Sequence, residues 1–542
     1  MAKQSSQALT PVYGESTDAP IVRSIADISP SDFMQMPTAL EKPERESRYP
    51  IPQKDFNALK AEAETAERGA LGIGNSSTDA SAMNINNQSA DSSDADANSE
   101  DGLPLASTGA PTPMAPMAPV SFNGMNATGW TPPDCTMAVG LNHVLVSVNT
   151  GMACFTKAGV SVFNIPNLAT FLGAAVPANA KIFDPKLIYD HYADRYVLII
   201  TAVRNAPNPL GSWIIVAASN TNNPTGTWTF YTLNALTTVG GVNAWSDYPT
   251  VGFDSQGIYV STNQFSFAGG GSFQFSRIRI LKKAQIYAAA PVTWADYNSL
   301  TNNDGSVAFT IQPCTHFHGG GNGTAYFVNS YWPSAAGSTK LTLWKLVNPI
   351  TTPTLTRVAV TVNNFKMPPN ALQPGGTLTT GDIRLLNAVY QFSGGVQRVW
   401  AAHTVSIQWQ GDPTPRSAAR WYEIDVNSNA VVQQQDYGAV GLYYTYPAIQ
   451  TDANRNAYMV FTTVGQTTFA QMRQTGRKVA DAVNTMQGSA LVKAGVSAHL
   501  SGRWGDYFGV ARDPSVTTEV WGFAEFAAAA GQWGTYVVKM KF

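Results

Sequence analysis

The sequence is short of charge and of long apolar runs, and both shortages exclude classes of protein. Asp, Glu, Lys and Arg make up only 13% of the 542 residues, against roughly 25% in an average soluble domain. A net charge of −2 provides no basic surface for nucleic acid or an anionic membrane. No apolar run reaches the ~20 residues that span a bilayer. We therefore expect neither a nucleic-acid partner nor membrane insertion.

Cysteine is scarce as well. The three cysteines, Cys135, Cys154 and Cys314, are an odd number, which excludes a fully paired disulfide framework within one chain. We expect them to be buried, small apolar residues. The N-terminus has no apolar segment of the kind that a standard signal peptide contains. A removed leader, another export route and an intracellular location are all compatible with this start.

Sequence motifs of the common hydrolases are missing. The chain has no G-x-S-x-G and no H-E-x-x-H segment, and the segment 219–228 is similar to a sialidase Asp-box turn but lacks its aspartate. We therefore predict no catalytic residue. One set of histidines is a candidate Zn²⁺ site: His316 and His318 share a face of a strand, and His403 lies in the following unit.

Two regions of different character divide the chain. Residues 1–118 are rich in Ser, Asp, Asn, Ala and Pro, and such composition buries too little apolar surface to offset the entropy of ordering. We predict a largely disordered extension with one short helix over 55–71. From residue 119 to 542 the chain is rich in strand-forming residues and turns.

Seven segments of the second region share one layout: a polar residue, an apolar strand, a tight turn and a second, strongly apolar strand. The polar residues are spaced 50–70 residues apart; they are Asp134, Asp184, Asp247, Gln312, Asp382, Thr445 and Asp506. A third strand follows in each unit and a fourth in most. Four antiparallel strands repeated seven times predict a seven-bladed β-propeller. The last unit has room for only three strands, so we expect residues 118–125 to supply its fourth and close the ring.

The segments "FNGMNATGWTPPDCTMAVGLNHVLVSVNT", "FDPKLIYDHYADRYVLI", "NNPTGTW", "WSDYPTVGFD" and "RWGDYFGVARDP" together resemble a group of bacterial exported β-propeller proteins whose functions are largely uncharacterised. The resemblance covers residues 119–542. It implies a secreted or cell-surface location, and it implies little about function.

Five of the seven polar residues are aspartates, and we expect them to ring one mouth of the central channel. They are Asp134, Asp184, Asp247, Asp382 and Asp506. Close carboxylates repel one another, so they call either for a hard cation such as Ca²⁺ or for local backbone N–H donors. Aromatic residues cluster beside them, among them Trp245, Tyr248, Trp504 and Tyr507. These rings would stack on sugars if exposed, or pack between blades if buried. A second set, Asp190, Asp254, Asp452 and Asp513, is predicted to cap the turns that follow the first strands.

Three functions remain compatible with these residues. The first is a non-catalytic propeller that presents one face to a glycan or protein, with the extension as a tether or targeting arm. The second is a polysaccharide hydrolase or lyase that uses two of the channel-mouth aspartates. The third is a structural component or cargo of a surface layer or secreted particle.

Overall fold

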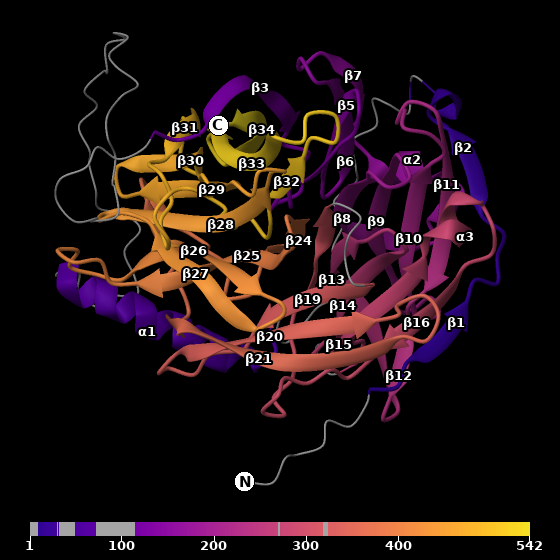
Figure 1. Cartoon of the computed structure of the whole chain (residues 1–542), viewed down its shortest axis with the longest axis horizontal. Coiled ribbons are helices and arrows are strands. Elements are labelled where there is room, and N and C mark those ends of the chain that lie inside the picture. The colour runs from indigo at the N-terminus through magenta and orange to yellow at the C-terminus, as the bar shows by residue number, and fades with distance from the viewer. Residues whose placement is uncertain (1–8, 30, 32–48, 72–113, 269–270, 318–322) are drawn as a thin grey trace.

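The computed structural model is a β-propeller, with about 55% of its residues in strands. It describes residues 9–29, 31, 49–71, 114–268, 271–317 and 323–542. Figure 1 shows the sheets arranged around a common centre. The fold class predicted from the sequence is therefore confirmed as a β-propeller.

Five sheets of four or five strands stand as separate blades. In chain order these comprise β4 (Thr136–Val139), β5 (His143–Val148), β6 (Gly151–Thr156) and β7 (Ser161–Ile165); β8 (Lys181–Asp190), β9 (Arg195–Arg204), β10 (Gly211–Ser219) and β11 (Thr227–Asn234); β17 (Gln312–Pro313), β19 (Thr324–Ser330), β20 (Ser338–Val347) and β21 (Thr354–Phe365); β28 (Leu442–Thr451), β29 (Ala457–Gly465), β30 (Thr468–Arg477) and β31 (Ala490–Lys493); and β32 (Gly509–Arg512), β33 (Val520–Ala529) and β34 (Gln532–Lys541) with β3 (Met117–Asn126).

The prediction of seven separate, equal sheets is wrong, because an eleven-stranded sheet replaces the remaining ones. It contains two antiparallel runs: β13 (Val242–Phe253), β14 (Gly257–Ser266), β15 (Phe273–Lys282) and β16 (Thr293–Tyr297); and β24 (Asn387–Ser393), β25 (Val396–Ile407), β26 (Arg416–Asp425) and β27 (Ala430–Tyr437). The three-residue strand β18 (Thr315–Phe317) joins the runs by pairing in parallel with both β13 and β24.

A glycine permits this junction. A Cβ atom at Gly252 of β13 would collide with the carbonyl of Cys314, which immediately precedes β18. Because Gly252 has no side chain, the two backbones approach closely enough for Phe253 to pair with Thr315. The pairing of β18 with two neighbouring sheets leaves no periodic pattern in the sequence. Counting the repeats therefore could not predict that these sheets are joined.

The closure predicted for the ring is confirmed. β3 pairs antiparallel with β34, with Val120 opposite Lys539 and Phe122 opposite Val537. The first strand of the second region therefore completes the final sheet, which the chain would otherwise leave with an unpaired edge.

The prediction of a mostly disordered extension is wrong for part of the described residues. β1 (Val12–Glu15) pairs with β16 and β2 (Ile21–Ser24) pairs with β11, so both lie at the rim of the ring (Figure 1). The helix predicted over 55–71 is present as α1 (Gln53–Leu71). The Ser/Asp-rich stretch 75–102 lies outside the described residues.

Apolar faces of neighbouring sheets form the core. The middle strands are buried on both faces, as in β9, where Tyr196–Val203 are buried throughout. Leu198 packs in a cluster with Leu145 of the preceding sheet, whereas Ile199 packs with Val260 of the following one. Alternate residues of one strand thus pack against the sheet before it and the sheet after it. A single sheet would expose both of these apolar faces to water, so it is not stable alone.

Candidate functional site

A buried lysine stands among the predicted acids at one end of the channel. Asp134, Asp184 and Asp506 all act electrostatically on the amine of Lys186, which is only 9% exposed. Burial lowers the pKa of this lysine to about 7, although the three carboxylates raise it in part. The structure therefore brings together three of the five predicted aspartates. We call Asp134, Asp184, Asp506 and Lys186 the acid end.

Local backbone geometry places these acids. Asp134, Asp184 and Asp506 have φ values of 55°, 56° and 32°, in the left-handed region that Asp tolerates better than most residues. β8 carries a bulge between Phe183 and Lys186. The bulge re-aims the side chains at the point where the chain turns into the innermost strand.

Two tyrosines close the acid end. The Lys186 amine lies 2.9 Å from the ring centroid of Tyr507, and the Tyr248 and Tyr507 rings meet edge to face at 5.7 Å. The Tyr507 hydroxyl donates to the Pro185 carbonyl, and the Tyr248 hydroxyl donates to the Asp506 carbonyl. Burial raises the pKa of both hydroxyls, so they are neutral hydrogen-bond donors at neutral pH.

The other two predicted aspartates have separate surroundings. Asp382 binds Arg384 through both carboxylate oxygens, at 2.6 and 2.9 Å, and accepts the Arg384 backbone N–H at 2.8 Å. The guanidinium of Arg384 in turn lies 4.4 Å from the Tyr248 ring centroid. Asp247 is buried in β13 opposite Asn263. Neither has the open surroundings that a catalytic carboxylate needs.

The aromatic residues predicted beside the acids are buried. Trp245, Tyr248, Trp504 and Tyr507 are between 0% and 4% exposed. Trp245 packs among Phe183, Phe265 and Phe309, and the Trp504 indole donates to Thr462. These rings pack between sheets, as one of the two interpretations of the sequence proposed, and they offer no face for stacking on a sugar.

The candidate Zn²⁺ site does not assemble among the described residues. Both ring nitrogens of His403 are hydrogen-bonded, to the Ile383 carbonyl and the Tyr422 hydroxyl, and burial lowers its pKa to about 3. His316 stacks on Tyr326 and makes a tilted ring contact with Tyr390, and burial lowers its pKa to about 4. His318 lies outside the described residues.

Across the described part of the chain, no group of three or more His, Cys, Asp or Glu side chains is arranged to hold a metal. The Lys186 amine, on which three of the predicted carboxylates act, already supplies a positive charge at the acid end. Ca²⁺ binding therefore stays a prediction for which this geometry adds no support. All three cysteines are buried and free.

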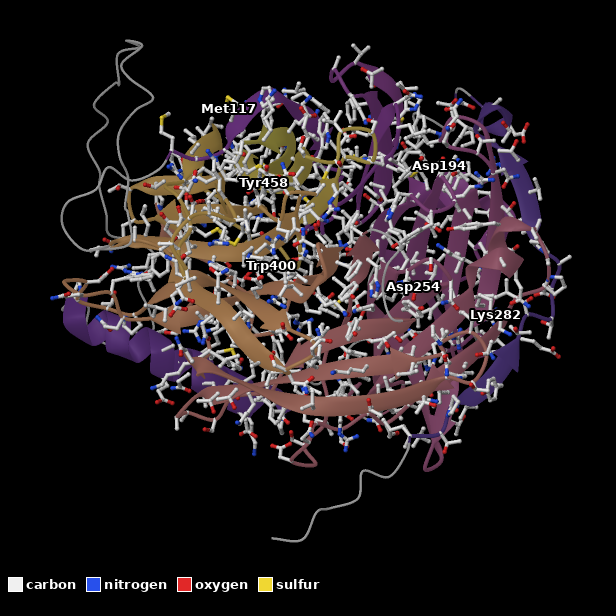
Figure 2. All side chains as sticks on the ribbon, in the orientation of Figure 1. Met117, Asp194, Asp254, Lys282, Trp400 and Tyr458 are labelled. Carbon is white, nitrogen blue, oxygen red and sulfur yellow. The ribbon has the colours of Figure 1, made fainter. Side chains whose placement is uncertain are left out.

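The turn aspartates behave as predicted. Asp254 accepts backbone N–H groups of Gln256 and Gly257, and Asp513 accepts those of Ser515 and Val516. Each also binds an aromatic donor of the next strand: Tyr259 donates to Asp254 and Trp521 donates to Asp513. The sequence did not predict this second bond, which fixes the turn to the strand behind it. Asp254, which follows β13, is labelled in Figure 2.

A cavity of about 320 Å³ runs along the channel from Lys186 toward the turn end. Inner strands of several sheets line it, so that β8 contributes Lys186 through Tyr189 and β32 contributes Gly509 through Arg512. Most lining side chains are apolar; Met137, Val251, Phe253, Leu386, Ala388 and Phe508 are examples. At the turn end lie Asp194, which Figure 2 labels, and Arg512, whose guanidinium is 4.3 Å from the Phe317 ring centroid.

Several polar groups of the cavity wall join neighbouring inner strands. Thr136 accepts the Leu187 N–H, and Gln312 donates to the Leu385 carbonyl. Asn387 both donates to and accepts from the backbone of Ile449. By contrast, no hydrogen bond or salt bridge joins the Lys186 amine to any residue that the structure describes. Sequence reasoning missed Lys186, although its place two residues after Asp184 in "FDPK" put it on the same inner strand.

Comparisons with known proteins found distant structural likeness and no match in sequence. No protein-family model matches the chain, and its sequence matches none of the curated proteins. Similar solved structures are β-propeller proteins. A protein of unknown function from Dyadobacter fermentans is 11% identical, with a TM-score of 0.38, and the match covers 68% of this chain and 96% of that one. An arabinanase from Bacillus subtilis is 14% identical, with a TM-score of 0.28 and coverages of 55% and 96%.

A xylan β-1,4-xylosidase from Bacillus halodurans is 10% identical, with a TM-score of 0.29 and coverages of 78% and 95%. At these identities the likeness concerns the fold alone. The propeller fold implied by the sequence's resemblance to exported bacterial propellers is seen in the sheets of this structure, and export stays a prediction. No helix within the described ranges is both long and apolar enough to cross a membrane.

Proposed function

We propose that the protein is a non-catalytic binding propeller whose central channel takes a small molecule with an apolar body. The observation that carries this proposal is the 320 Å³ cavity, which has mainly apolar walls and a few polar groups. Ligand sites have this composition, and they start at about this size. A binding surface for a glycan or protein partner would have to use residues other than the four buried aromatic side chains.

Occupation of the channel can be tested with benzotrifluoride, a compact apolar probe, by ¹⁹F NMR on the full chain. The wild type should give a broadened or separate bound signal. Val251→Trp puts an indole into the cavity, which Val251 lines, and should abolish that signal. Val440→Trp is the matched control, because Val440 is 49% exposed. Equal signals from all three proteins would contradict the proposal.

A polysaccharide hydrolase or lyase is the second candidate. One observation favours it: three carboxylates gather around a lysine whose pKa is about 7, and perturbed groups of this kind are common in active sites. Among the described residues that line the cavity, however, Asp194 is the only carboxylate, whereas a glycosidase needs two about 5–10 Å apart. Release of reducing ends or unsaturated products, lost in Asp184→Asn, would favour this candidate over the first.

We also propose an extracellular or cell-surface location, supported by the resemblance of residues 119–542 to exported propellers. A role in a surface layer or secreted particle is a further candidate, for which residues 1–118 would act as the docking arm. Part of that extension already pairs with the ring through β1 and β2. An arm would therefore have to come from its other residues.

A further inference from the structure

The amine of Lys186 is a polar group of the channel wall that makes no hydrogen bond or salt bridge with any residue in the described part of the chain. Its side chain is 91% buried, yet it lines the cavity. The other amides and hydroxyls considered above are committed to bonds between inner strands. Against the amine stand the Tyr507 ring and, farther away, the Tyr248 ring at 5.8 Å.

The charges around the amine limit what it can bind. Asp134 precedes β4, Asp184 lies on β8 and Asp506 precedes β32, and all three act on Lys186. An anionic ligand would be repelled by these carboxylates. A neutral ligand that acquires positive charge at the amine would instead be stabilised by them. Carbonyl compounds meet that condition, because their condensation with an amine gives an imine that can take up a proton.

We propose that the channel binds a small apolar aldehyde or ketone and that Lys186 holds it as an imine. This inference rests on the proposed function and specifies its ligand class. The lysine nitrogen adds to the carbonyl carbon, and the resulting carbinolamine loses its oxygen as water together with the two amine protons. One C=O bond is replaced by one C=N bond, so the step needs neither oxidant nor reductant.

Two properties of the site favour this step. A lysine with a pKa of about 7 is about half unprotonated at neutral pH, whereas an exposed lysine is almost fully protonated. Desolvated lysines in apolar pockets are the ones that form Schiff bases with carbonyl substrates. The apolar walls would hold the body of the ligand while Lys186 holds its carbonyl carbon.

The test uses 4-(trifluoromethyl)benzaldehyde, the carbonyl counterpart of benzotrifluoride, with borohydride to reduce any imine to a stable secondary amine. Peptide mapping of the full chain at pH 7 should show Lys186 modified roughly tenfold or more faster than exposed lysines. Lys186→Arg should lose this modification while keeping the circular dichroism of the wild type. Lys283 is the internal control, since it is buried but paired with Asp190 at 2.7 Å, and it should stay unmodified.

The two probes separate failure of this inference from failure of the proposed function. If benzotrifluoride binds but Lys186 is modified no faster than exposed lysines, the imine is overturned and the binding channel stands. If neither probe enters the folded protein, both proposals are overturned. Selective modification of Lys186 that Val251→Trp prevents supports both.

Discussion

At the scale of single residues, the acids at the channel mouth serve architecture. Asp184 accepts the backbone N–H of Tyr248 from the next unit at 3.3 Å, and its own N–H donates to Asn149 of the preceding one. The Asn149 amide also donates to Asp134 at 2.6 Å. Asp184 thus ties its sheet to both neighbouring units, and Asn149 holds Asp134 within its own unit. These bonds are structural, and they give a reason for an acid at both positions that needs no shared chemistry.

Lys186 is predicted to lower stability at neutral pH. Its pKa is about 7 in the folded protein, against an ordinary lysine value of 10.5. The unfolded chain therefore holds more protons between these pH values, and stability rises with pH across that window. Lys186→Met should therefore stabilise the protein at pH 7 by roughly 2–4 kcal/mol, with the gain shrinking toward pH 10. Urea unfolding of both proteins from pH 6 to 10 measures the difference.

Below pH 7 the gain should be constant, because the lysine is then protonated in both states. The exposed Lys366 provides the control, and Lys366→Met should show no such trend. A stability difference between wild type and Lys186→Met that does not vary with pH would show that the amine is not desolvated as the structure has it.

At the scale of elements, α1 is attached to the ring through Phe56, Lys60 and Glu64, the last of which accepts from Asn370 at 2.7 Å. Phe56 is 6% exposed, lies 6.3 Å from the Trp332 ring and stacks on Tyr49, which precedes the helix, with 3.4 Å between ring centroids. Lys60 donates to the Pro368 carbonyl at 2.6 Å and to the Thr380 hydroxyl at 3.1 Å. Asp382, which also acts on Lys60, is the partner of Arg384. Through these contacts the helix lies beside Asp382 and its partner Arg384.

Loss of the Phe56 contact should release the helix and leave the ring folded. Phe56→Ala removes a buried ring, a change that costs about 3–5 kcal/mol in a full core. We expect thermolysin to cleave within residues 53–64 at least about tenfold faster, because proteolysis reports local opening. Lys54→Ala, at an exposed position of the same helix, should leave cleavage unchanged. Equal cleavage in both variants would show that Phe56 does not anchor α1.

The sequence predicted elements best where local signals are strong. Alternating apolar strands and Asp-capped turns revealed the repeated units, and α1 was found within two residues of its start because Asp55 and the charged run that follows are typical of a helix. β1 and β2 were missed because each has only four residues. Their conformation comes from pairing with β16 and β11, which no local pattern reveals.

The candidate site was predicted less well than the fold, for a related reason. The spacing of the aspartates follows the repeat, and three of the five act together on Lys186. The Lys186 site depends on what three distant segments present to one point: the approaches to β4 and β32, and β8. Trp245 and Trp504 pack between sheets and do not face a ligand, because both are buried. Their burial follows from how the sheets meet in three dimensions, which the sequence does not show.

At the scale of the whole molecule, ring closure ties the two ends of the second region together. Phe122 of β3 lies opposite Val537 of β34, and its ring contacts Trp521 of its own sheet and Phe155 of β6 in the next sheet. Breaking this pairing exposes an edge of the last sheet and also uncovers its neighbours. We therefore expect stability to be lost throughout the ring, since each sheet is stable only while the next one covers it.

Phe122→Pro tests this expectation, because proline removes a backbone N–H and is poorly tolerated inside a sheet. The free energy of unfolding of this variant should fall by about 3 kcal/mol or more. The variant should unfold in one transition at which tryptophan fluorescence and circular dichroism coincide.

Val22→Pro is the control. It makes the same change in β2, an added outer strand in which Val22 lies opposite Thr229, and it should lower the free energy of unfolding far less. Closure would not control the ring if the two variants had equal, small effects, or if Phe122→Pro melted the last sheet in a separate transition. Both prolines are placed in an antiparallel end strand of a sheet. If only Phe122→Pro unfolds the whole ring in one transition, the ring is a single cooperative unit that depends on its closure.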